Sequence, residues 1–164
     1  MEPIRIVVAD DHAVFRMALR ALLQAESGMA VVGEAATGEA AVEAALSLRP
    51  DVVLMDLSMP GCGGLAATRT ITTATGARVL VLSVCPEHEC LLPALAAGAS
   101  GYLAKSAAAD ELVPLVRRVA RGEVGLSSSG VRTLVGAATA AHDGTGRGRA
   151  RGSASRTARA RAGG

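Results

Sequence analysis

The sequence predicts a doubly wound α/β fold, in which helices cover both faces of a parallel β-sheet. Short β-branched runs alternate with alanine-rich segments along the first 122 residues, and runs such as VVLM and VLVL are apolar throughout. Strands joined by helical crossovers pair in parallel with right-handed connections. Continuously apolar strands are typical of a sheet that is buried on both faces.

Five strands and five helices account for this pattern. The expected strands are Ile4–Ala9, Ala30–Ala35, Val52–Met55, Val79–Leu82 and Gly101–Ala104. The expected helices are Asp11–Ala25, Gly38–Leu48, Gly64–Thr73, a segment ending near Gly98, and Asp110–Arg121. Thr37 can cap the second helix, and Pro50 ends it because proline cannot continue the helical hydrogen-bond ladder.

Two prolines fall inside expected helices, Pro93 in the fourth and Pro114 near the start of the fifth. A helix-interior proline costs about 3 kcal/mol unless it sits in the first turn. The fourth helix therefore either starts late, near Leu91, or is kinked.

The charge distribution divides the chain into three parts. We expect a mildly acidic domain over residues 1–122, a linker over 123–141 with a helix from Ser128 to Ala141, and a basic tail over 142–164. The tail holds six arginines against Asp143 as its one acidic residue, and it has no aliphatic side chain larger than alanine. Such a segment cannot bury a core, so the sequence predicts disorder there.

Composition excludes several classes of protein. Phe15 and Tyr102 are the only aromatic residues, which argues against modules that stack bases on rings. No stretch approaches the roughly 18 apolar residues that span a bilayer, and no signal peptide is evident, so we expect a cytoplasmic protein with no membrane partner and with reduced thiols. Cys85, His88 and Cys90 invite a zinc hypothesis, but a fourth ligand is not obvious, and we expect neither a metal nor a redox site there.

Polar residues follow four of the five expected strands. Asp10 and Asp11 follow the first, Asp56 the third, Ser83 the fourth and Lys105 the fifth. Ligands of open α/β sheets bind outside the carboxyl ends of the strands, so these groups should meet at one edge. His12 follows the acidic pair and could touch the site, but the stronger expectation is a solvated residue of the first helical turn.

The chemistry of this set favours phosphoryl transfer. Three crowded carboxylates repel one another unless a cation neutralises them, and Mg²⁺ is bound by carboxylates together with phosphate oxygens. A carboxylate beside Mg²⁺ can attack a phosphoryl group and form an aspartyl phosphate. Lys105 and Ser83 can then bind the phosphoryl oxygens.

Four motifs carry a resemblance at this point. ADD at 9–11, LMDLSMPGCGG at 54–64, LS at 82–83 and GASGYLAK at 98–105 resemble the receiver domain of two-component response regulators, most closely the NarL/LuxR-type subgroup. The resemblance covers about residues 3–128. It implies a five-stranded, flavodoxin-like sheet of order 2-1-3-4-5.

Position by position, the resemblance makes Asp56 the phosphoacceptor and Lys105 its ion-pair partner. It assigns Mg²⁺ to Asp10, Asp11, Asp56 and the backbone carbonyl of Ser58. Ser83 matches the hydroxyl that turns toward the phosphoryl group on activation, and Tyr102 matches the ring that swings inward as Ser83 moves, a two-state element biased by a local charge. It implies a sensor histidine kinase as partner, a chain that catalyses only its own phosphorylation and dephosphorylation, and homodimer formation on phosphorylation.

The resemblance also implies an output domain that the sequence does not match. Regulators of this subgroup continue into a helix-turn-helix domain, whereas residues 131–164 lack the apolar periodicity for one. A truncated or out-of-frame remnant, a solvated tail, and a basic arm that binds the phosphate backbone of DNA are the alternatives for the tail. The alternative function is accordingly a DNA-binding transcription regulator. The sequence does not have the phosphate-binding loop that a flavin-binding module needs, nor the Asp-x-Asp nucleophile motif that a phosphatase needs.

Overall fold

The computed structural model describes residues 1–147 and has an α/β architecture with a six-stranded parallel sheet of order β2-β1-β3-β4-β5-β6. The strands are β1 (Ile4–Ala9), β2 (Met29–Ala35), β3 (Val52–Asp56), β4 (Arg78–Ser83), β5 (Gly101–Ala104) and β6 (Gly125–Leu126). The helices are α1 (Ala13–Gln24), α2 (Gly38–Leu48), α3 (Gly63–Ala74), α4 (Glu87–Ala96), α5 (Ala108–Ala120) and α6 (Ser128–Arg147), with a 3-10 turn, η1, at Lys105–Ala107.

The predicted strand order is confirmed, and the prediction of five strands is short by one. Gly125 pairs with Gly101, and Leu126 pairs with Tyr102. A Cβ on Gly101 would collide with the carbonyl oxygen of Gly125, so β6 can approach the sheet only because residue 101 has no side chain. The signal for β6 is weak in sequence because the strand is only two residues long.

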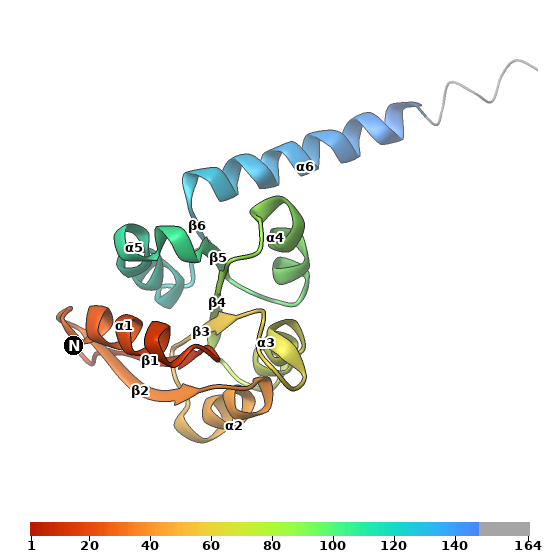
Figure 1. The fold of residues 1–164 in the computed structure, drawn as a ribbon. Coiled ribbons are helices and arrows are strands. Elements are labelled where there is room, and N and C mark those ends of the chain that lie inside the picture. Colours follow the sequence, from red (N-terminus) through yellow and green to blue (C-terminus); the bar gives the residue numbers. More distant parts are fainter. Residues whose placement is uncertain (148–164) are drawn as a thin grey trace, which may run out of the picture.

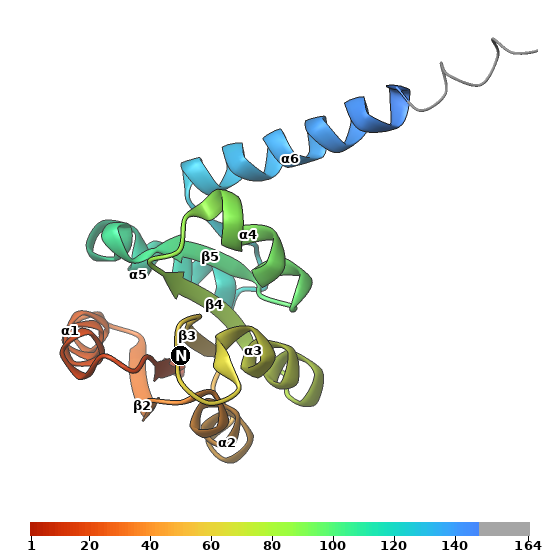
Figure 2. The same cartoon turned by 45° about the vertical axis from the view of Figure 1, so that its right-hand side comes forward.

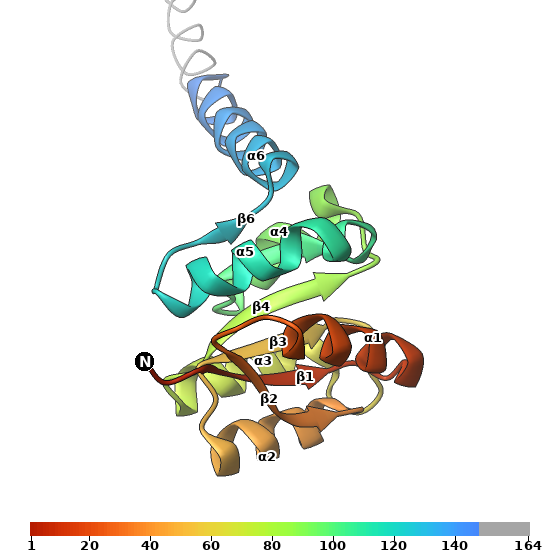
Figure 3. The ribbon, with the colours of Figure 1, turned by 90° about the vertical axis from the view of Figure 1, so that its left-hand side faces the viewer.

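Helices cover both faces of the sheet, as predicted (Figure 1). One face of the core packs against α1 and α5 and includes Leu19, Leu23, Leu112 and Val116. The other packs against α2, α3 and α4 and includes Ala45, Ile71, Leu91 and Tyr102. Figure 3 shows α1 and α5 on the same side of the sheet.

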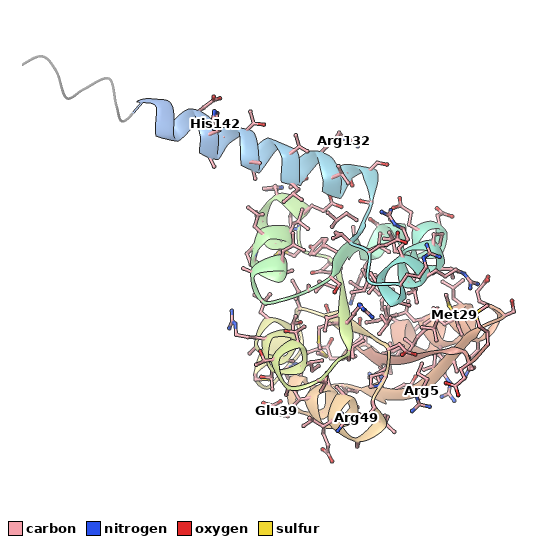
Figure 4. All side chains as sticks on the ribbon, turned by 180° about the vertical axis from the view of Figure 1, so that it is seen from behind. Arg5, Met29, Glu39, Arg49, Arg132 and His142 are labelled. Atoms are coloured by element: carbon pink, nitrogen blue, oxygen red, sulfur yellow. A yellow bond between two sulfur atoms is a disulfide. The ribbon has the colours of Figure 1, made fainter. Side chains whose placement is uncertain are left out.

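The end of α2 shows how the chain terminates a helix before a proline. Arg49 takes a left-handed conformation with φ of 48°, because the residue before a proline avoids the right-handed helical region. The guanidinium of Arg5 donates to the Leu48 carbonyl at 2.6 Å, which satisfies an otherwise open helix end. Arg5 and Arg49 lie at the opposite end of the molecule from α6 (Figure 4).

The two helices that contain a proline begin earlier than the sequence suggests. Of the two alternatives for the fourth helix, the late start near Leu91 is wrong, because α4 begins at Glu87 and contains Pro93 in its interior. The alternative of a kink stays a prediction. The fifth helix starts at Ala108 rather than Asp110, which leaves Pro114 beyond its first turn. Buried Leu91 in α4 and Leu112 in α5 explain why both helices persist, since tertiary packing overrides local propensity.

α6 leaves the sheet and runs past α4 before it extends beyond the rest of the molecule (Figure 2). The Ser127 hydroxyl accepts a hydrogen bond from the Gly130 amide at 3.1 Å and so caps the helix. The expected helix from Ser128 is present, but it continues through Arg147 into the segment for which the sequence predicts disorder. Residues 148–164, where the rest of that prediction falls, lie outside the described residues, and the predicted domain boundaries stay a prediction.

Two further observations complete the fold. Within residues 1–147, no helix combines the length and the apolar character that a membrane crossing requires. The expectation of reduced thiols is wrong for two of the three cysteines, because Cys85 and Cys90 form a disulfide. The first turn of α4 brings Cys90 back toward Cys85, with their Cα atoms 6.1 Å apart, a separation that a disulfide spans.

Candidate phosphoryl-transfer site

The carboxyl ends of the strands bring the predicted acidic residues together. Asp10 directly follows β1, and Asp56 is the last residue of β3. These strands are neighbours in the sheet, so carboxylates far apart in sequence become adjacent. Asp10, Asp11, His12 and Asp56 each offer a ligand atom within 4.8 Å of the others.

Lys105 lies between the two buried carboxylates. Its Nζ is 2.6 Å from Asp10 Oδ2 and 3.5 Å from Asp56 Oδ2, and the Asp10 and Asp56 side chains are each 2% exposed. Both oxygens are buried, and the Lys105 ammonium is the cation that faces them within the described residues. Buried acceptors of this kind are costly unless another group binds them.

Burial raises the pKa of Asp56 above its ordinary value of 3.8, and the nearby Asp10 charge raises it further. The Ser58 amide, which donates to Asp56 Oδ1 at 3.3 Å, and the Lys105 ammonium act in the opposite direction. The site therefore disfavours the charged form of Asp56 and would gain from a further cation.

This donor set fits Mg²⁺. The ligand atoms that the acidic residues offer are carboxylate oxygens, the hard donors that Mg²⁺ prefers. Two of these oxygens are buried beside the Lys105 ammonium. The acidic pocket is thus compatible with the predicted cofactor.

Ser83 and Tyr102 meet at one backbone position. The Ser83 hydroxyl accepts a hydrogen bond from the Cys85 amide at 3.0 Å, and the Tyr102 hydroxyl donates to the Cys85 carbonyl at 2.7 Å. Both side chains are fully buried. The two residues that the resemblance pairs as a switch thus share Cys85 as their common partner.

Sequence reasoning missed two contacts at the site, those of Phe15 and Arg16, and gave less weight to a third, that of His12. The ring of Phe15 lies 4.6 Å from Lys105 Nζ, a cation–π contact, although we had no functional expectation for Phe15. His12 is largely exposed, as expected, but its Nδ1 lies 3.2 Å from Asp11 Oδ1. Arg16 donates to the Asp10 carbonyl at 2.6 Å. The available signal was the helical spacing of residues 12 and 16, together with Phe15, directly after the acidic pair.

Tyr102 provides a first testable prediction. Burial raises its pKa above the ordinary value of 10.0, and the Glu87 charge adds to the effect. A raised acid pKa means that the folded state favours the neutral phenol, so the free energy of unfolding falls as the pH rises through this range. Because Tyr102 is the only tyrosine, an absorbance titration of the phenolate reports it alone. Equal midpoints of the phenolate titration for the folded chain in buffer and the unfolded chain in denaturant would contradict the prediction.

Comparison with known proteins agrees with this geometry. The family model for the response regulator receiver domain matches residues 6–117. The response regulator UvrY of Escherichia coli (strain K12) is 43% identical over 121 residues, which are 73% of this chain and 56% of UvrY. The chain therefore spans little more than half the length of that relative.

Solved structures show the same fold. A LuxR-family two-component response regulator from Aurantimonas sp. SI85-9A1 superposes with a TM-score of 0.79 at 35% identity, covering 84% of this chain and 99% of that one. The receiver domain of the putative response regulator NarL from Mycobacterium tuberculosis gives a TM-score of 0.72 at 36% identity, covering 75% and 100%. The chain belongs to the response regulator receiver family of two-component systems.

Proposed function

We propose that this chain acts in phosphorelay signal transduction by accepting a phosphoryl group on Asp56 from a phosphohistidine of a sensor kinase. The observation that carries the proposal is the convergence of Asp10, Asp11 and Asp56 near the single ammonium of Lys105. A purely structural ion-pair cluster would be expected to balance its buried charges. Three carboxylates facing one ammonium leave an excess of negative charge, which a bound cation would neutralise during phosphoryl transfer.

The transfer forms one bond and breaks one. A carboxylate oxygen of Asp56 attacks the phosphorus, the phosphorus–nitrogen bond of the donor breaks, and the departing imidazole takes up a proton. Lys105 neutralises a phosphoryl oxygen, and the Ser58 amide helps to orient the carboxylate. A groove of 530 Å³ beside Lys105, lined in part by Val14 and Phe15, gives the donor a path to the site.

Asp10, Asp11, Asp56 and the Ser58 carbonyl would hold Mg²⁺. When bound, the ion neutralises charge on the carboxylates and on the phosphoryl oxygens. The chain's own contribution is to keep the carboxylates buried and close together. In this view the protein catalyses only its own phosphorylation and dephosphorylation.

The modified Asp56 would act on Ser83 and Tyr102. The Ser83 hydroxyl can donate to a new phosphoryl oxygen, and turning toward that oxygen would disturb the hydrogen bond that Ser83 accepts from the Cys85 amide. A shift of Cys85 would in turn move Tyr102, whose hydroxyl donates to the Cys85 carbonyl. The α4–β5–α5 face would then change shape and offer a surface for homodimer formation.

The structure does not test two further predictions from the sequence, the cellular location and the alternative function. A cytoplasmic location stays a prediction. The alternative of a DNA-binding transcription regulator depends on a segment that lies mostly beyond Arg147, outside the described residues.

Intact-mass analysis tests the proposal. Incubation with a small acyl phosphate donor and Mg²⁺ should add one phosphoryl group to the wild-type chain and none to Asp56→Asn. Asp110→Asn removes an exposed carboxylate of α5 and should leave the mass gain intact. Chelation of Mg²⁺ should abolish it. Equal mass gain in wild type and Asp56→Asn, or no gain with several donors, would refute the proposal.

A further inference from the structure

Two half-buried cysteines bracket the start of α4. Cys85 lies between the end of β4 and Pro86, Cys90 lies in the first turn of α4, and the two are joined by a disulfide. The bond closes a loop with a sequence separation of five residues. Since a disulfide constrains the unfolded chain less when its loop is short, the main effect of this one is local.

The local effect falls on the switch. The backbone of Cys85 binds both Ser83 Oγ, through its amide, and the Tyr102 hydroxyl, through its carbonyl. Movement of the Cys85 backbone therefore cannot leave either switch residue undisturbed. The disulfide ties this backbone to α4, so that the position of Cys85 depends on the helix.

Cys90 contacts the core, and the loop between the two cysteines contacts the start of α6. Cys90 packs against the same apolar cluster that contains Tyr102 and Leu126 of β6. Between the cysteines, Glu87 accepts hydrogen bonds from the hydroxyls of Ser127 at 3.3 Å and Ser129 at 3.0 Å. The loop closed by the disulfide thus contacts the switch on one side and the start of α6 on the other.

We propose that Cys85 and Cys90 form a redox site whose oxidation state controls how readily the receiver switches. A protein dithiol would be the reductant: its thiolate attacks one sulfur, a mixed disulfide forms, and its second thiol releases Cys85 and Cys90 as two thiols. Two electrons and two protons pass to the pair, and the reductant becomes a disulfide. In a reducing compartment disulfides are transient and redox-sensing, which fits a half-buried pair beside a moving element.

The inference rests on the proposed function for its readout. It also predicts which oxidation state of the two cysteines favours the switched state. With the disulfide formed, the Tyr102 ring is fully buried, the orientation that the resemblance assigns to activation. Oxidation should therefore favour the switched state and reduction should oppose it. Linkage is reciprocal, so activation at Asp56 should in turn make the disulfide harder to reduce.

The full chain is titrated with beryllofluoride and Mg²⁺, once oxidised and once reduced with dithiothreitol. Fluorescence of Tyr102 reports the switch, since the chain has one tyrosine and no tryptophan. The midpoint, rather than the amplitude, is compared, because a disulfide near a ring also changes brightness. We expect the oxidised chain to bind about fivefold tighter or more, the lower end of typical coupling energies.

Three variants make the test specific. Cys85→Ser and Cys90→Ser should behave like the reduced chain under both conditions. Cys62→Ser, which removes the exposed free cysteine, should keep the full difference. In a dithiol redox buffer, beryllofluoride should shift the Cys85–Cys90 equilibrium toward the disulfide, an effect that a purely structural bridge would not show.

The outcomes are distinguishable. Equal midpoints in the oxidised and reduced chains, or peptide mapping that finds no Cys85–Cys90 bond after oxidation, would overturn the redox proposal and leave the proposed function intact. A beryllofluoride response that is absent from both forms would overturn the proposed function, and the redox proposal with it.

Discussion

Replacing Lys105 with methionine should destabilise the protein by about 3 kcal/mol at neutral pH, the scale expected when one partner of a buried ion pair is removed. The variant leaves the Asp10 and Asp56 carboxylates buried side by side without their cation. Methionine keeps much of the volume of the lysine stem, so packing against Phe15 is largely retained. The loss is therefore electrostatic, and denaturant unfolding measures it.

The loss of unfolding free energy caused by Lys105→Met should grow as the pH rises. Lys105 lowers the pKa of Asp56, so its removal raises that pKa further above the ordinary value of 3.8. A carboxyl group with a raised pKa binds its proton more tightly in the folded state, so the free energy of unfolding falls as the pH rises through this window. The penalty of Lys105→Met should be largest at neutral pH and should shrink as the pH falls toward 3.8. Magnesium chloride should restore part of it.

An exposed ion pair provides the matched control. Arg118 and Glu123 pair at 3.4 Å with side chains that are nearly half exposed, and such pairs contribute about 0–1 kcal/mol. Arg118→Met should therefore change the free energy of unfolding by less than about 1 kcal/mol at any pH. Equal penalties for the two variants, or a Lys105→Met penalty that is constant with pH, would contradict the electrostatic explanation.

Replacing Gly64 with alanine is expected to have the second largest effect. A Cβ at this position would collide with the carbonyl oxygen of Asp56 and would lie 2.6 Å from the Cα of Leu57. Both obstacles are backbone, so neither can move aside as a side chain would. Overpacking costs about 1–3 kcal/mol, whereas the helix propensity of alanine returns about 1 kcal/mol. We expect a net loss of up to about 2 kcal/mol and slower phosphorylation, because the Asp56 backbone must shift.

Gly136→Ala is the control variant, because it changes the helix propensity without a collision of the new Cβ. Gly136 lies inside α6 with open space around its Cα, so alanine should be neutral or stabilise α6 by up to about 1 kcal/mol. Denaturant unfolding and the rate of phosphoryl mass gain are measured for both variants. A Gly64→Ala protein as stable and as readily phosphorylated as Gly136→Ala would show that α3 tolerates a side chain against Asp56.

Much of the fold is readable from local pattern because the central strands β3 and β4 are buried on both faces. The runs Val52–Met55 and Val79–Leu82 are apolar throughout and are followed by Asp56 and Ser83, and a polar residue after such a run marks the rim of the sheet. Asp56, Ser83 and Lys105 could be placed at one edge for this reason. Their roles in phosphoryl transfer stay predictions until the chemistry is measured.

Other features depend on contacts between distant segments. The two-residue strand β6 exists because Gly101 and Gly125 lack side chains and can pair closely, which no local pattern encodes. The late start near Leu91, one of the two alternatives for the fourth helix, is wrong because the cost of Pro93 was weighed without the burial of Leu91.

By itself the sequence determined the class of fold, the edge of the sheet that bears the chemistry, and the identity of the acidic residues gathered there. These follow from periodicity and from the order of strands and polar residues along the chain, which are local properties. Only the tertiary structure decided that Lys105 lies between Asp10 and Asp56, that Phe15 contacts it, and that Ser83, Tyr102 and the Cys85–Cys90 disulfide meet at one peptide unit. The physical reason is that these relations are distances between separate strands and helices, set by how the core packs rather than by neighbours in sequence.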